Sequence, residues 1–129
     1  QRLMGDTKDT IRRMAAQGVT PVIYTSRTEL RTDDAAERQA LGKRVSDFLV
    51  ETVRQLPCHP KYLVAKGGIT SHDILTHGLN VGMARVMGQV INSVPCIMAE
   101  KDGSPLPYII FPGNVGTKDS LKEIYDILG

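Results

Sequence analysis

Hydrophobic residues recur at helical spacing in several separate parts of the chain. The first part predicts a short helix over Thr7–Gln17, which Gly18 is placed to end. A shorter helix is expected over Ser71–Thr76, ending at Gly78. Amphipathic helices of this kind need another layer on which to bury their apolar faces.

The clearest amphipathic helix lies between residues 41 and 56, and the prolines of the sequence 57–60 end it, because proline cannot continue a helix interior. Its apolar face is formed by Leu41, Val45, Phe48, Leu49, Thr52, Val53 and Leu56. A final helix is predicted with Leu121, Ile124, Tyr125 and Leu128 as its buried stripe. Ser120 and Glu123 are spaced as a capping box for this helix.

Extended segments lie between these helices. Val19–Arg27 is rich in β-branched and apolar residues and predicts a strand, and the segments 61–65 and 106–111 predict two more. Met83–Ala99 predicts two strands with a break near Asn92–Pro95, and a turn signal follows at 102–103.

Strands that alternate with helices predict an α/β fold. We expect a three-layer, Rossmann-like domain with a mixed, mostly parallel sheet covered by helices, in which the two strands of Met83–Ala99 are antiparallel. The chain has 129 residues, of which 41% are hydrophobic, so it is long enough to form one domain, residues 1–129, with its own core.

Charge and composition exclude several classes of function. The net charge is +2 with scattered basic residues, and tryptophan is absent, so neither a nucleic-acid partner nor a membrane surface is expected. No apolar run approaches the roughly 18 residues of a membrane span. Cys58 and Cys96 lie far apart, which is typical of reduced thiols in a cytoplasmic protein.

Two glycine-rich loops each follow a predicted strand and precede a helix. The first contains Gly67 and Gly68, and the second contains Gly113, Asn114 and Gly116. In open α/β sheets, ligands bind outside the carboxyl ends of the strands. A glycine lets the backbone approach a phosphate closely, and the following helix start adds free N–H donors. The two loops therefore indicate an anion or nucleotide site.

Thr70 and Ser71 have two alternative roles in the first loop. They would supply hydroxyl donors to a ligand, or one of them would cap the helix in a tight turn that binds nothing. The chain contains neither the P-loop sequence nor the dinucleotide-binding fingerprint. Pattern alone leaves both readings open.

The segment KGGITSHDILTHGLNVGMARVMGQVINSVPCIM, followed by PYIIFPGNVGTKDSLKEIYDIL, resembles the C-terminal nucleotide-binding domain of the four-carbon acid sugar kinase family. The resemblance extends from about Val19 to the C-terminus. In such kinases these loops contact ATP, which carries Mg²⁺ on its phosphates. The matching positions here are Gly67, Gly68, Ile69, Thr70 and Gly113.

The resemblance implies part of an ATP-dependent kinase that transfers the γ-phosphoryl group to a hydroxyl of a four-carbon sugar acid. The chain would be most of the C-terminal domain. The sugar-acid domain, and a first strand that carries a serine of the ATP site, are expected before Gln1, so this fragment alone would be inactive. The resemblance implies no catalytic residue in this chain. It is compatible with a homo-oligomer.

Two positions depart from the family pattern. Ile69 stands where many relatives have an acidic residue, and Phe111 with Pro112 stands where many have Lys-Ser. Lys66 would replace the lost lysine as a phosphate partner, or it is a solvated side chain at a strand end.

Other candidate residues have an equally good structural explanation. Arg27 would reach a phosphate or lie on the surface, and His72 with Asp73 would be an acid–base pair or residues of a helix start. A metal set of Cys58, His59, His72 and His77 lacks the usual zinc-site spacing.

Two other classes of function remain. One is a non-catalytic Rossmann-like module for regulation or oligomerisation, whose glycines serve only turns. The other is an NAD- or flavin-binding module, for which the fingerprint is missing.

Overall fold

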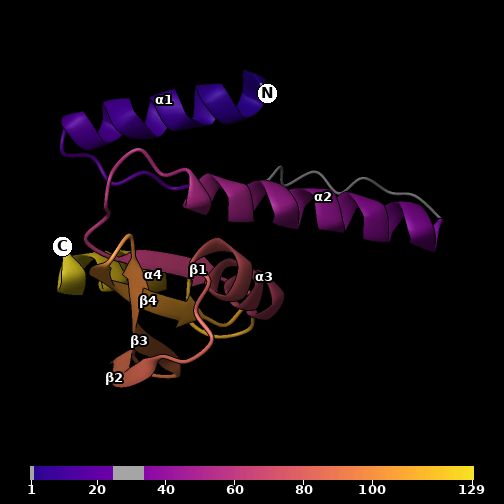
Figure 1. Cartoon of the computed structure of the whole chain (residues 1–129). Helices are drawn as coiled ribbons and strands as arrows, with labels where there is room; N and C mark the ends of the chain where they lie inside the picture. The colour runs from indigo at the N-terminus through magenta and orange to yellow at the C-terminus, as the bar shows by residue number, and fades with distance from the viewer. Residues whose placement is uncertain (1, 25–33) are drawn as a thin grey trace. The chain divides into compact units, whose positions relative to one another are not determined.

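The structure, a computed structural model, describes residues 2–24 and 34–129, which form two compact units that divide the chain after Cys58. The first unit contains α1 (Arg2–Ala16) and α2 (Ala35–Arg54) (Figure 1). The second contains β1 (Leu63–Lys66), α3 (Gly68–Asp73), a π-helical turn (Ile74–Gly78), β2 (Arg85–Ile91), β3 (Val94–Lys101), β4 (Ser104–Phe111) and α4 (Ser120–Leu128).

Helix α1 confirms the helix expected over Thr7–Gln17 and begins earlier. Gly18 ends it with a positive φ of 71°. The N–H of Gly18 donates to the carbonyl of Ala15 at 3.1 Å, and the N–H of Val19 donates to that of Met14 at 2.9 Å. These two bonds form the Schellman motif that glycine favours at a helix end.

Helix α2 confirms the long amphipathic helix and extends it toward the N-terminus. The Asp34 side chain caps it by accepting a hydrogen bond from the N–H of Ala36 at 2.9 Å. The helix ends at Arg54, before the first proline of the sequence 57–60.

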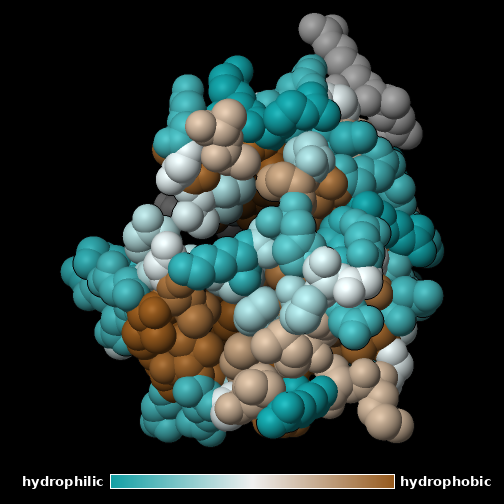
Figure 2. All heavy atoms as spheres, turned by 60° about the vertical axis from the view of Figure 1, so that its left-hand side comes forward, coloured by the Kyte–Doolittle hydropathy of each residue, from teal (hydrophilic) through white to brown (hydrophobic). Residues whose placement is uncertain are grey.

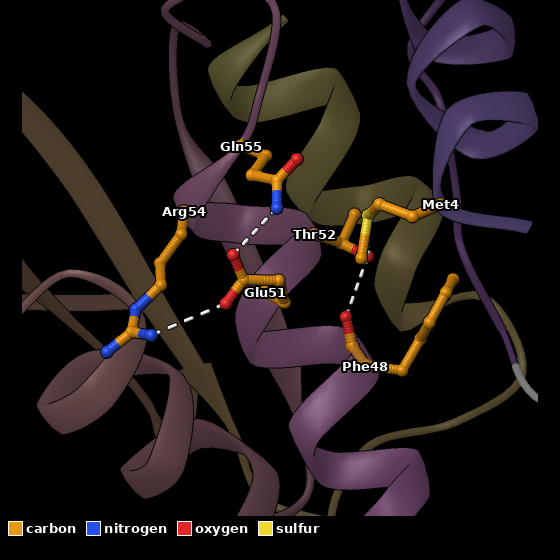
Figure 3. Close-up of polar contacts among 6 residues, drawn as sticks. All are labelled: Met4, Phe48, Glu51, Thr52, Arg54 and Gln55. Carbon is orange, nitrogen blue, oxygen red and sulfur yellow. Dashed lines mark hydrogen bonds and ion pairs between the residues drawn. The ribbon is translucent and has the colours of Figure 1, made fainter. Parts of the chain in front are cut away.

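Thr52, the polar member of the α2 stripe, is almost completely buried. Its hydroxyl donates to the carbonyl of Phe48 at 2.8 Å and lies 3.8 Å from the sulfur of Met4 in α1 (Figure 3). The neighbouring Glu51 accepts hydrogen bonds from the side chains of Gln55 and Arg54, whereas Thr52 bonds to the helix backbone. A threonine therefore fits this apolar face because its own helix satisfies the hydroxyl.

The strand predicted over Val19–Arg27 is wrong for its described part. Residues 19–24 form no strand, and Val22 and Tyr24 are 70% and 75% exposed. β-Branched residues favour a strand only where a partner strand and a packed face are present, and no described strand pairs with this segment. Residues 25–27, including Arg27, lie outside the described residues.

The sheet confirms the α/β class and the mixed pairing. Its order is β1-β4-β3-β2, with β1 parallel to β4 and the other two pairs antiparallel. The predicted antiparallel pair is β2 with β3. Only one pair is parallel, whereas a mostly parallel sheet was expected, because β2, β3 and β4 are joined by turns too short for a crossover.

The turn between β3 and β4 has the backbone conformation of a tight two-residue hairpin, whereas Ser93 alone has a positive φ in the turn between β2 and β3. Asp102 and Gly103 have φ values of 53° and 80°, and Ser93 has a φ of 66°. Positive φ at both central residues is typical of a two-residue hairpin turn, so the turn signal at 102–103 is confirmed.

Helices lie on both faces of the sheet, so this unit has three layers. On one face, Ile109 and Phe111 of β4 form a buried cluster with Val94 and with Ile124 of α4. On the other face, the hydroxyl of Tyr108 donates to the carbonyl of Ser71 in α3 at 2.6 Å. Successive residues of β4 thus contact helices on opposite faces of the sheet, because side chains along a strand alternate between the two faces.

The capping box predicted at the start of α4 is wrong. Asp119 is the cap position, and its side chain makes no capping bond. Ser120 is the first helical residue, and its hydroxyl accepts a hydrogen bond from the N–H of Thr117 at 2.7 Å. The hydroxyl therefore secures the preceding loop and does not cap the helix.

The apolar stripe of α4 is only partly buried. Ile124 is 1% exposed and Leu128 packs against the core, whereas Leu121 and Tyr125 are 44% and 46% exposed. Figure 2 shows that hydrophobic residues gather in a contiguous brown area on one face of the molecule. Helical periodicity places residues on one face of a helix but does not determine how wide the neighbouring layer is.

We predict that Tyr108→Phe lowers the free energy of unfolding by about 1 kcal/mol, because the bond from the hydroxyl to Ser71 is lost while the ring still fills its site. Urea denaturation followed by circular dichroism measures this difference. Tyr125→Phe is the control, since Tyr125 is half-exposed. An equal loss of stability in both variants would contradict the role of the buried bond.

The same tyrosine makes stability depend on alkaline pH. Burial raises the pKa of Tyr108 well above its usual range. The unfolded chain releases this proton near pH 10 and the folded chain keeps it, so the contribution is complete below about pH 10 and falls as the pH rises further. Between pH 9 and pH 11, Tyr108→Phe should lose less stability in urea denaturation than the unmodified protein.

Candidate functional site

The two glycine loops meet where the parallel strands end. Lys66 and Phe111, the last residues of β1 and β4, are register partners. The N–H of Gly67 donates to the carbonyl of Phe111 at 2.8 Å. A Cβ added to Gly113 would lie 3.9 Å from the Cα of Gly67. The fold thus places the first loop, residues 67–70, against the second loop, residues 112–117.

The first loop leads directly into α3, which begins at Gly68, earlier than the expected Ser71, and continues through the π-helical turn to the expected end at Gly78. Gly67 has a φ of 102°, a conformation that side chains other than glycine rarely adopt. The first bond of the helix runs from the N–H of Ser71 to the carbonyl of Gly67 at 2.9 Å. The N–H groups of residues 68–70 precede it and have no acceptor within the helix.

Ser71 is held by the fold. It is 2% exposed, and its single hydroxyl proton is shared between the carbonyls of Ala65, at 3.1 Å, and Gly67. Its own carbonyl accepts from Tyr108. This arrangement favours the structural reading of Ser71 over the hydroxyl donor to a ligand.

Thr70 and Ile69 differ from Ser71. Thr70 is partly exposed, and its side chain makes no hydrogen bond to another described residue. Ile69 is 80% exposed, although it is a large apolar residue. Both side chains are therefore available to a ligand at the first loop.

The glycines of the two loops fall into two kinds. Gly116 has a φ of 84°, and a Cβ there would lie 2.6 Å from the Ser120 hydroxyl oxygen and 2.9 Å from Cζ of Phe111. Gly68 and Gly113 have no positive φ, and an added Cβ would meet no atom closer than 3.9 Å. The fold requires glycine at 116, whereas it has room for a Cβ at 68 and 113.

A hollow of about 420 Å³ lies beside the second loop. Residues 91–93 of the β2–β3 turn, residues 115–117 of the second loop, and Ser120 and Glu123 of α4 line it. It combines apolar surface from Ile91 and Val115 with hydroxyl and carboxylate oxygens. Its volume lies within the range of small-molecule sites.

Other candidates are not assembled into a site. His72 and Asp73 are neighbours in α3, and successive helical positions do not face each other. Among residues 2–24 and 34–129, no three His, Cys, Asp or Glu residues are arranged to hold a metal ion. Cys58 and Cys96 are both free, and burial raises the pKa of the Cys96 thiol, which lowers its reactivity.

The sequence did not reveal one contact at this site. The Nζ of Lys66 lies 5.6 Å from the centroid of the Phe111 ring. The two residues are far apart in sequence, but each directly precedes its loop or the proline that opens it. This shared position before the two loops is the feature of the sequence that could have indicated the contact. The parallel register of β1 and β4 then brings the two residues together.

Comparison with known proteins gives a family and solved structures of similar fold. The family model for a nucleotide-binding C-terminal domain matches residues 1–121. Among curated proteins, no significant match was found.

Two crystal structures of a domain of unknown function (DUF1537) from Bordetella bronchiseptica are similar to this chain, and both are described as domain-swapped dimers with bound citrate. Their TM-scores are 0.62 and 0.58 at 18% and 19% identity, and they cover 97% and 92% of this chain. This chain spans 30% of the length of each. At this identity the likeness shows the fold. In the described part of the chain, no helix is long and apolar enough to cross a bilayer.

We predict that Gly116→Ala destabilises the second unit by about 1–3 kcal/mol, because its Cβ would overlap Ser120 and Phe111 in a strained backbone. Gly113→Ala should change stability by no more than about 0.5 kcal/mol. Urea denaturation of both variants tests this difference. Equal stabilities would show that the turn at Gly116 adjusts freely.

Proposed function

We propose a function from the premise that this chain belongs to the family of nucleotide-binding C-terminal domains, whose model matches residues 1–121. The resemblance found in the sequence is confirmed at the level of this family. The proposal is that the domain binds ATP for a kinase that transfers the γ-phosphoryl group to a hydroxyl of a four-carbon sugar acid. The parent protein would be a cytoplasmic phosphotransferase of carbohydrate metabolism.

One observation carries the proposal: Gly68 and Gly113 are glycines that the fold itself does not require. They lie on two loops in contact at the carboxyl ends of parallel strands, where open α/β sheets bind ligands. A bare backbone at both positions lets a phosphate approach the chain from between the loops. A pair of simple turns would not need glycine there.

Each site residue then has a role in binding. Gly67 provides the positive φ that turns the chain into α3, and the N–H groups of residues 68–70 point donors at a phosphate. The Thr70 hydroxyl adds a donor. The exposed Ile69 would pack against the nucleoside, and the hollow beside the second loop offers space for part of it.

Mg²⁺ would arrive with the nucleotide. Bound with the nucleotide, it would supply neutralisation of the phosphate charge. The residues of this chain would hold the phosphate chain in position for in-line transfer.

The sugar acid and the residues that activate its hydroxyl would belong to another part of the enzyme. Domain closure would bring the two substrates together and exclude water. The free cysteines support a cytoplasmic location, and the domain-swapped dimers of the similar protein support a homo-oligomer.

Titration calorimetry with Mg-ATP and with ADP tests the site. In the longest natural form of the protein, Gly113→Val and Gly68→Val should each weaken binding by about tenfold or more, because their side chains occupy the phosphate path. Circular dichroism should remain unchanged, since a Cβ at either position meets no atom closer than 3.9 Å.

The matched control is Gly82→Val. An added Cβ at Gly82 also meets no atom within 4 Å, and Gly82 has no positive φ. Gly82 precedes β2, which is the outermost strand on the side of the sheet away from β1. Binding unaffected by Gly113→Val, or lost equally in Gly82→Val, would contradict the site. No nucleotide binding by the intact protein would favour a non-catalytic module.

A further inference from the structure

Lys66 occupies a distinctive position at the edge where the two loops meet. It is the last residue of β1 and directly precedes Gly67, and its side chain is exposed. Its register partner on the parallel strand is Phe111, which the second loop follows. The side chains of register partners lie on the same face of a sheet, so Lys66 belongs to the face that α4 covers.

The ammonium group of Lys66 is held near the second loop by an aromatic ring. Its Nζ lies 5.6 Å from the centroid of Phe111, within the distance of about 6 Å at which a cation is attracted to a ring face. This contact restrains a side chain that is otherwise flexible. The positive charge therefore lies beside the second loop and above the end of β4.

The ring that holds Lys66 is itself fixed. Phe111 is 2% exposed and packs with Val94, Ile109 and Ile124. Its Cζ occupies the space that a Cβ of Gly116 would need. The tight turn of the second loop thus leaves room for the ring, and the ring positions the cation.

The charge of Lys66 has no anionic partner among the described residues. Lys43, Lys101 and Lys122 each pair with an aspartate, whereas Lys66 makes no ion pair with a carboxylate in the described part of the chain. An exposed cation that is held against a ring at the second loop and has no carboxylate partner is suited to bind an anion.

We infer that Lys66 contacts the phosphate chain of the bound nucleotide, an inference that rests on the proposed function. The loops offer only neutral N–H and hydroxyl donors, whereas the ammonium supplies a full positive charge. Lysine acts here as a point charge on a long stem, which suits the several oxygens of a polyphosphate. The role is one of binding and positioning the phosphates.

The test compares three variants of the whole protein by titration with Mg-ATP, ADP and adenosine. Lys66→Met keeps an unbranched apolar stem against Phe111 but removes the charge. It should weaken ATP and ADP binding by about tenfold and leave adenosine binding unchanged, because adenosine has no phosphate. Lys66→Arg should retain most of the ATP affinity, since the charge remains.

Lys61→Met is the matched control, because Lys61 is also exposed but lies just before β1, at the opposite end of the strand. It should bind all three ligands as the unmodified protein does. Increasing salt should reduce ATP affinity less steeply in Lys66→Met than in the control.

The outcomes separate this inference from the proposed function. If Gly113→Val abolishes ATP binding and Lys66→Met does not change it, Lys66 is a solvated residue and the inference alone is wrong. Equal weakening of ATP and adenosine by Lys66→Met would also overturn it, because that pattern indicates a structural role. If Gly113→Val has no effect on ATP binding, or the intact protein binds no ATP, the proposed function falls and the inference falls with it.

Discussion

The parallel pairing of β1 with β4 is the constraint on which the candidate site depends. Leu63 to Lys66 pair in register with Tyr108 to Phe111, so both strands end at the same edge of the sheet. The bond from the Gly67 N–H to the Phe111 carbonyl continues this pairing for one step into the loop. The two loops, which are more than forty residues apart in the sequence, are thereby placed in contact. If these strands were antiparallel, the two loops would lie at opposite ends of the strand pair.

The loops show how glycine serves two different purposes within a few residues. Gly116 is needed because the turn brings Ser120 and the Phe111 ring against its Cα. Gly113, three positions earlier, has neither a strained backbone nor a close neighbour. Steric necessity explains the first, and access to the backbone explains the second. The same ring that requires glycine at 116 also holds the ammonium of Lys66, so the packing of the core and the charge at the edge are connected.

Several elements were predictable because their signals are local. Apolar periodicity predicted helices over 7–17 and 41–56, and the observed helices at 2–16 and 35–54 begin earlier in each case. The hairpin at Asp102 follows from its turn sequence. Errors arose where a neighbour decides the outcome. The segment 19–24 has strand propensity but no described partner strand, and the stripe of α4 is wider than the layer that covers it.

The candidate site divides in the same way. The sequence by itself determined the family, the two glycine loops, and which residues in them lack a side chain that would block a ligand. Tertiary structure alone decided that the loops touch, that Ser71 is engaged by Ala65 and Tyr108, and that Lys66 lies over Phe111. The physical reason is that backbone conformation and turn chemistry depend on adjacent residues, whereas strand register and side-chain contacts depend on residues that only the folded sheet brings together.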